Sequence, residues 1–267
     1  MIRRAMTVAG SDSGGGAGLQ ADLKTFTAMG VSGSSIITAL TAQNSLEVRG
    51  IFEVPPSFVE LQMDAVLSDI GTDAAKTGML YSADIIKVVS GKFREYSVPY
   101  VVDPVMISKS GSRLLRKDAV DEMISSLLPG AVLITPNIPE AETLSSVKIS
   151  NQEDAVRVAE KLHNTIGCAV LVKGGHSQGE NSIDILCRDG KISTFSSRRI
   201  NTENTHGTGD TLSAAITSCL ALGLDMGISI REAKAFLDGA IKNSFSSGKG
   251  FGSLNHFWRN KREIGIE

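Results

Sequence analysis

The sequence has little of several residue types that mark particular classes of protein. Only three of its 267 residues are cysteine, only 5% are aromatic, and no run approaches the ~18 apolar residues of a membrane-spanning helix. Cys168, Cys187 and Cys219 are scattered and lack metal-ligand spacing, so we expect buried free thiols. The N-terminal apolar stretch is too short for a secretory signal. These absences predict a cytoplasmic protein with no membrane partner.

An excess of charge of either sign is also absent. The 27 Lys and Arg residues nearly balance 29 Asp and Glu residues, for a net charge of −2, which excludes a general nucleic-acid binder. A hydrophobic content of 42% argues against disorder. Since no Pro-rich linker or composition break divides the chain, we expect a single domain over residues 1–267.

Short β-branched runs alternate with longer amphipathic segments along most of the chain. The runs are centred near Met6, Ile36, Lys76, Val101, Leu133 and Leu171. Strands that are apolar along most of their length and separated by helices indicate a mostly parallel central sheet in a three-layer α/β/α fold. Residues 182–187 and 191–197 flank Asp189-Gly190, which predicts one antiparallel hairpin at an edge of the sheet.

In such a sheet the ligand site lies at the carboxyl ends of the strands. The first strand leads into Ser11–Gly18, which contains four glycines and opens a helix. Glycines let backbone N–H groups approach a ligand, and a helix N-terminus favours an anion. The glycines do not fit GxGxxG and the Walker A lysine is missing. A tight β–α turn without a ligand is therefore an equal alternative.

The segment from Asn204 to Asp210 gives a sharper signal. Gly207 and Gly209 flank Thr208 at the start of a strongly helical run, so that consecutive N–H groups can converge on one anion. Asp210 falls in the first helical turn, which favours its ionised form. A carboxylate beside an anion hole suits phosphorylation of an alcohol, in which it accepts the hydroxyl proton. The alternative is that Asp210 only caps the helix.

Three further strand ends carry polar residues suited to phosphoryl transfer. Asp103 ends one strand and could bind Mg²⁺ or its waters, and Asn137 and Glu140 follow the next and could lie on the same metal. Lys173 ends a third strand and could neutralise nucleotide phosphates. Each could instead be structural, as a turn former, a helix-terminal charge or a solvated lysine. Their shared edge of one sheet favours the functional interpretation.

Several segments together resemble the hydroxymethylpyrimidine/phosphomethylpyrimidine kinases of thiamine biosynthesis, in the ribokinase-like superfamily. They are VAGSDSGGGAGLQADLKTF, ITALTAQNS, AKTGML, VVDPVMISKSGSRLL, LITPNIPEAE, VLVKGGH, NTHGTGDTLSAAI and GKGFG. The resemblance spans nearly the whole chain. The GTGD loop belongs to the superfamily at large, whereas GAGLQADLKTF, ALTAQN and DPVM point to the pyrimidine kinases.

The resemblance implies a role for each candidate residue. Those implied around the aminopyrimidine are Gly10, Asp22, Gln43 and Met79. The nucleotide would be bound by Asn137, Lys173, Thr208 and His206, the magnesium ion by Glu140 and Asp103, and the anion hole formed by Gly207, Thr208 and Gly209, with Asp210 as base. The Gln43 amide can pair with a ring nitrogen and the exocyclic amine together. For Asp22 the alternative is a surface carboxylate. The resemblance also implies a homodimer.

One departure from the pyrimidine kinases concerns Asp210. Many members have cysteine there, in a GTGC sequence, whereas aspartate is usual in the sugar and nucleoside kinases of the superfamily. We expect a kinase that uses ATP and Mg²⁺ to phosphorylate 4-amino-5-hydroxymethyl-2-methylpyrimidine and then its monophosphate. A pyridoxal or pyridoxine kinase is the alternative enzyme. A non-catalytic ligand sensor is the other alternative, against which Asp210 and the intact GTG loop argue. Glycine-containing loops at residues 108–113 and after Gly174 are candidate lids.

Overall fold

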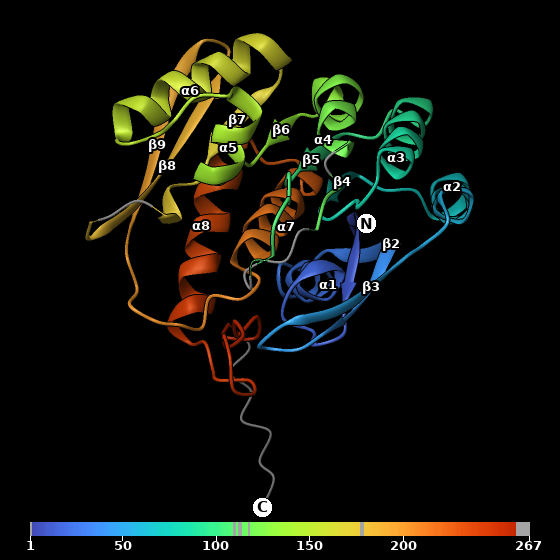
Figure 1. Cartoon of the computed structure of the whole chain (residues 1–267), viewed down its shortest axis with the longest axis horizontal. Helices are drawn as coiled ribbons and strands as arrows, with labels where there is room; N and C mark the ends of the chain where they lie inside the picture. The colour runs from blue at the N-terminus through green and yellow to red at the C-terminus, as the bar shows by residue number, and fades with distance from the viewer. Residues whose placement is uncertain (1, 109–110, 112–113, 117, 177–178, 260–267) are drawn as a thin grey trace, which may run out of the picture.

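Nine strands form one sheet in the computed structural model, which describes residues 2–259 apart from 109–110, 112–113, 117 and 177–178 (Figure 1). Their order across the sheet is β3-β2-β1-β4-β5-β6-β7-β8-β9. The strands are β1 (Arg4–Asp12), β2 (Ser32–Gln43), β3 (Val48–Glu53), β4 (Ala74–Thr77), β5 (Tyr100–Val102), β6 (Leu133–Ile134), β7 (Ala169–Val172), β8 (Asn181–Arg188) and β9 (Lys191–Arg198).

The six strands predicted from the sequence are confirmed as β1, β2, β4, β5, β6 and β7. Neighbours in the order β2-β1-β4-β5-β6-β7 all pair in parallel. The predicted hairpin is β8–β9, which pairs antiparallel to β7, with a left-handed Asp189-Gly190 turn. A second antiparallel strand, β3, lies at the opposite edge and was not predicted. Its sequence VRGIFE is interrupted by Gly50 and no residue of it is fully buried, so neither apolar continuity nor strict alternation marks it.

Helices cover both faces of the sheet (Figure 1). The helices are α1 (Gly18–Ala28), α2 (Pro56–Ala65), α3 (Ala83–Glu95), α4 (Ala119–Glu122), α5 (Ile138–Ser145), α6 (Gln152–Ile166), α7 (Thr208–Ala221) and α8 (Met226–Lys242). Short π or 3₁₀ segments lie at Val66–Ile70, Met123–Leu127, Leu128–Gly130 and Gly174–His176. Helices α1, α7 and α8 pack together on one face, and α2 to α6 lie on the other. The three-layer α/β/α architecture is as predicted.

Burial of the sheet on both faces explains the continuous apolar runs in the sequence. In β5 the side chain of Val101 packs in the cluster with Leu212 and Phe236, while Val102 packs in the cluster on the opposite face with Phe93. Alternate residues of a strand point to opposite faces, so a doubly covered strand is apolar throughout. The three cysteines are buried and free, as expected. No helix within the described part of the chain has the length and apolarity needed to cross a membrane.

Candidate active site

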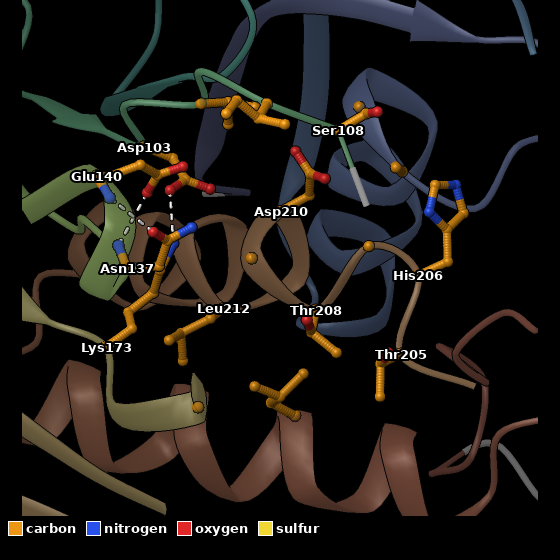
Figure 2. Close-up of a pocket in the computed structure, with 18 of the residues that line it drawn as sticks. Asp103, Ser108, Asn137, Glu140, Lys173, Thr205, His206, Thr208, Asp210 and Leu212 are labelled. Atoms are coloured by element: carbon orange, nitrogen blue, oxygen red, sulfur yellow. Dashed lines mark hydrogen bonds and ion pairs between the residues drawn. The ribbon is translucent and has the colours of Figure 1, made fainter. Parts of the chain in front are cut away.

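A cavity of about 770 Å³ lies along the carboxyl ends of the parallel strands. Gly10 and Gln43, from β1 and β2, line one end, and Asp184 and Arg198, from β8 and β9, line the other. The first turn of α7 lies between them. Figure 2 shows Asp103, Asn137, Glu140 and Lys173 on one side of Asp210, and His206 on the other. The predicted lids at 108–113 and after Gly174 include residues 109–110, 112–113 and 177–178, which lie outside the described residues.

The glycine-rich loop after β1 is folded around Asp12 rather than around an open anion site. The Asp12 carboxylate accepts hydrogen bonds from the N–H groups of Gly14 (2.8 Å), Gly16 (3.0 Å) and Ala17 (2.9 Å). With those N–H groups satisfied internally, the tight β–α turn is the interpretation that the structure supports. Asp12, only 4% exposed, was not singled out in the sequence, because a single aspartate in a glycine-rich loop has no distinguishing local pattern.

The imidazole of His206 lies close to the side chains of Asp12 and Gln43. Its Nε2 atom is 3.0 Å from Asp12 Oδ2 and 3.4 Å from Gln43 Nε2. Burial disfavours the charged form of Asp12, but the hydrogen bond with His206 and those from Gly14 and Ala17 outweigh it and lower the pKa of Asp12. His206, which was predicted to bind the nucleotide, lines the cavity on the side of Asp210 opposite Asn137 and Lys173 (Figure 2). It lies beside Gln43.

The GTG loop forms the open start of α7, as predicted. Gly207 is the N-cap in a left-handed conformation (φ 81°), and a Cβ there would lie 2.0 Å from the carbonyl oxygen of Gly16. Only glycine fits that position. Within the part of the chain that the structure describes, the N–H groups of Gly209 and Asp210 have no hydrogen-bond acceptor. Gly209 was predicted to belong to the anion hole and Asp210 was not, whereas the N–H of Thr208, which was predicted, donates to the Thr205 carbonyl at 3.4 Å. Free donors at a helix N-terminus beside the cavity form an anion-binding geometry.

Asp210 belongs to a buried chain of charged groups. Lys76 Nζ on β4 lies 3.1 Å from Asp210 Oδ1 and 2.7 Å from Asp22 Oδ1, and the side chains of Lys76 and Asp22 are both 0% exposed. Asp210 also accepts a hydrogen bond from the N–H of Gly18. Burial opposes ionisation of Asp210, but Lys76, then the N–H of Gly18 and the charge of His206, lower its pKa. Asp210 lines the cavity as predicted.

Asp22 does not line the cavity, so both interpretations of it are corrected. It is neither beside the pyrimidine end nor on the surface. Its Oδ2 atom accepts a hydrogen bond from the Thr7 hydroxyl at 2.6 Å, and its other oxygen pairs with Lys76. Burial raises the pKa of Asp22 to about 7 against the lowering effect of Lys76. Lys76 itself was missed, although a lysine that follows two alanines in a short apolar strand was a signal of a buried charge.

The polar groups after β5, β6 and β7 meet as predicted. Lys173 Nζ lies 2.7 Å from Asp103 Oδ1, which also accepts from the Thr135 hydroxyl at 3.3 Å. Asn137 and Glu140 form a capping box at the start of α5: each side chain accepts the other's backbone N–H, at 2.9 and 2.8 Å. The structural alternative for Glu140, a charge in the first turn of a helix, is therefore confirmed, and the capping contacts hold both side chains at the cavity wall.

Electrostatics in this group fit a divalent cation held in part by water. Burial raises the pKa of Glu140 to about 7, against the lowering effect of Lys173. Burial disfavours the charged form of Lys173, but Asp103 and Glu140 outweigh it and raise its pKa. Among the described residues no three His, Cys, Asp or Glu side chains could hold a metal together. Two carboxylates without a third protein ligand suit Mg²⁺, which usually keeps waters and binds substrate phosphates.

The doubly covered sheet, the open start of α7 and the carboxylate in its first turn define a ribokinase-like phosphotransferase. The family model for phosphomethylpyrimidine kinase matches residues 12–255, and the chain belongs to that family.

The comparisons with individual proteins agree with this assignment. The chain is 45% identical over 258 residues to the hydroxymethylpyrimidine/phosphomethylpyrimidine kinase of Bacillus subtilis, covering 96% of this chain and 95% of that protein. It is 49% identical over 252 residues to the thiamine biosynthesis bifunctional protein ThiED of Geobacter sulfurreducens, covering 94% of this chain but only 51% of that protein.

Solved structures of two kinds superpose on the chain. The ADP complex of Bacillus subtilis pyridoxal kinase has a TM-score of 0.90 at 34% identity and covers 98% of this chain and 100% of that one. The phosphomethylpyrimidine kinase of Clostridium difficile has a TM-score of 0.80 at 43% identity, covering 90% and 99%. The pyridoxal kinase thus matches better in shape and the pyrimidine kinase better in sequence.

Proposed function

We propose that this chain uses ATP to phosphorylate the hydroxymethyl group of 4-amino-5-hydroxymethyl-2-methylpyrimidine and then the resulting monophosphate, for thiamine biosynthesis. One observation carries the proposal. Asp210 and the free N–H groups at the start of α7 lie in one cavity between Gln43 on one side and the Asp103–Lys173 pair on the other. An acceptor alcohol and a phosphate donor can therefore meet at one carboxylate.

The pyrimidine binds at the end formed by β1, β2 and β4. Gln43 presents an amide that can pair with both a ring nitrogen and the exocyclic amine. The Thr41 hydroxyl, which donates to the Ser11 carbonyl at 2.9 Å, also lies 3.2 Å from Gln43 Oε1. Met79 packs beside Gly10, where a Cβ would lie 3.0 Å from the Met79 sulfur, so glycine lets the Met79 side chain lie against the end of β1.

The nucleotide binds at the opposite end, against Asn137, Lys173 and Thr208. Asp103 and Glu140 would hold a magnesium ion there, since Mg²⁺ prefers carboxylate oxygens. When bound, this ion neutralises negative charge on the phosphates and orients them. Lys173 supplies a fixed positive charge beside the same phosphates.

In the first step the hydroxymethyl oxygen attacks the γ-phosphorus, a new O–P bond forms, and the bond to the ADP oxygen breaks. Asp210 accepts the hydroxyl proton as the O–P bond forms, and the N–H groups of Gly209 and Asp210 bind the transferring phosphoryl oxygens. In the second step a phosphate oxygen of the monophosphate is the nucleophile. That oxygen is largely deprotonated at neutral pH, so it needs no base.

The protein works in the cytoplasm as a homodimer in this proposal. On the edge formed by β2 and β3, Leu40 and Phe52 are cross-strand partners and remain 45% and 66% exposed. Exposed apolar pairs on an edge strand are favourable sites for association.

A phosphorus NMR time course tests the activity. Purified protein is incubated with MgATP and either hydroxymethylpyrimidine or pyridoxal. We expect a monophosphate signal that gives way to a pyrophosphate with the first substrate. Turnover of pyridoxal alone, stopping at the monophosphate, would instead favour the vitamin B6 kinase suggested by the TM-score of 0.90. Binding without turnover of either substrate would favour a ligand sensor.

A further inference from the structure

The buried lysine on β4 has no role in the substrate contacts described above. Lys76 is 0% exposed and does not line the cavity, whereas its partner Asp210 does. Lys76 therefore makes no direct contact with a molecule in the cavity, whereas Asp210, which it contacts, can.

The position of Lys76 is fixed on every side. In the β1–β4 register Thr7 lies opposite Lys76, and both side chains reach Asp22 on α1, at 2.6 and 2.7 Å. Gly78 lies next to both charged groups, since a Cβ there would be 3.3 Å from Lys76 Nζ and 3.7 Å from Asp210 Oδ1. Asp22 thus anchors the ammonium group from the side away from the cavity, and the group reaches Asp210 on the cavity side.

A buried lysine requires compensation, because removing an ammonium group from water carries a penalty of several kcal/mol. Here burial disfavours the charged form, but Asp22, Asp210 and Asp103 outweigh it and raise the pKa of Lys76. The charged or titratable groups that act on Lys76 or Asp210 are Asp22 on α1, Asp103 after β5, Lys173 after β7, His206 before α7 and His256 against α7. Lys76 contacts the Asp210 carboxylate directly, at 3.1 Å.

The two steps of the proposed function place different charges beside Asp210. The alcohol is neutral, whereas a phosphate monoester carries about −1.5 to −2 charges at neutral pH. An ionised Asp210 would repel that acceptor, a difficulty that a neutral side chain at this position would not create. A fixed positive charge directly behind the carboxylate reduces the repulsion.

We propose that Lys76, anchored by Asp22, is a positioning residue that keeps Asp210 ionised for the alcohol step and offsets its charge in the phosphate step. The inference rests on the proposed function, since it distinguishes two acceptors at one site.

The test replaces Lys76 with methionine, which is also unbranched and one heavy atom shorter, and which removes the charge. The alcohol and phosphate steps are then assayed separately across pH, with KM and kcat determined for each acceptor. Burial raises the pKa of Asp210 and Lys76 lowers it, so removing the Lys76 charge should raise this pKa. We therefore expect the acid limb of the alcohol step to move up by at least about one pH unit. We also expect KM for the monophosphate to rise by about tenfold more than KM for the alcohol.

The matched control is Lys92→Met. Lys92 also pairs with carboxylates, at 2.9 Å from Asp64 and 3.0 Å from Glu95, but it lies on α3 outside the cavity lining. It should leave both the acid limb and the KM ratio unchanged. Because Lys76→Met leaves the buried Asp22 without its charged partner, the double variant Asp22→Asn/Lys76→Met removes both charges together and should show the same two effects.

A double-mutant cycle separates action through Asp210 from a general structural role. In an Asp210→Asn background, Lys76→Met should no longer change the KM ratio by more than about twofold. Equal losses in both steps with an unmoved acid limb, or an effect that persists without Asp210, would overturn the inference while leaving the proposed function intact. If the unmodified protein phosphorylates neither pyrimidine, the proposed function is wrong and the inference falls with it.

Discussion

Asp12→Asn is a stringent test of how the loop after β1 is held. Asp12 Oδ2 accepts hydrogen bonds from Gly16 and Ala17 and lies 3.0 Å from His206, while Oδ1 accepts from Gly14. Asparagine retains one oxygen, so one of these sets of donors must face an NH₂ group. The loss of a hydrogen bond to a charged acceptor costs about 1.5–3 kcal/mol. The remaining bonds are weakened as they lose the charge.

We therefore expect Asp12→Asn to lower the free energy of unfolding by about 2–4 kcal/mol at pH 7. Equilibrium urea unfolding measures this, with equal m-values as the condition for comparing the two proteins. Asp84→Asn is the control, because Asp84 is an exposed carboxylate on α3 and should leave stability close to that of the unmodified protein. A loss below about 1 kcal/mol would refute the hydrogen-bond accounting.

The same variant has a defined pH dependence. The pKa of Asp12 is lower in the folded protein than its ordinary value, because the hydrogen bonds outweigh burial. A lowered carboxyl pKa contributes stability above the unfolded pKa, and that contribution is lost as pH falls through the folded pKa. The stability difference between the two proteins should hold from pH 7 to about pH 5 and shrink below about pH 4. A difference that stays constant to pH 3 would contradict the assignment.

Three further predictions concern the start of α7 and the sheet edge. Asp210→Asn should slow the alcohol step by about 10²–10⁴-fold and the phosphate step less, and equal losses in a phosphorus NMR assay would contradict its role as base. Gly207→Ala should destabilise the protein more than Gly223→Ala in thermal unfolding. Both glycines have positive φ, but only at Gly207 would a Cβ meet another atom, and equal effects would refute the steric argument. Phe52→Asp should convert the proposed homodimer to a monomer in light scattering, and a mass equal to that of an unmodified dimer would exclude this edge as the interface.

The sequence predicted those features that depend on short stretches of chain. Apolar runs separated by amphipathic segments indicated the parallel strands and their covering helices, because strand and helix periodicities are local properties. The same is true of the Asp189-Gly190 turn, and of Gly207 and Asp210 at the start of α7. Strand β3 was missed because its residues are mostly exposed and carry no clear period.

Only the tertiary structure decided which polar residues meet. Lys76 contacts Asp210 across 134 residues of sequence and Asp12 contacts His206 across 194, so no local pattern marks either pair. Asp22 looked like a pyrimidine contact or a surface carboxylate, but the packing of α1 on the sheet places it behind Lys76. A side chain's neighbours, burial and charge partners depend on the register and packing of distant elements. The sequence by itself determined the layers and the local chemistry, and the packing decided which carboxylates are paired, which are buried and which line the cavity.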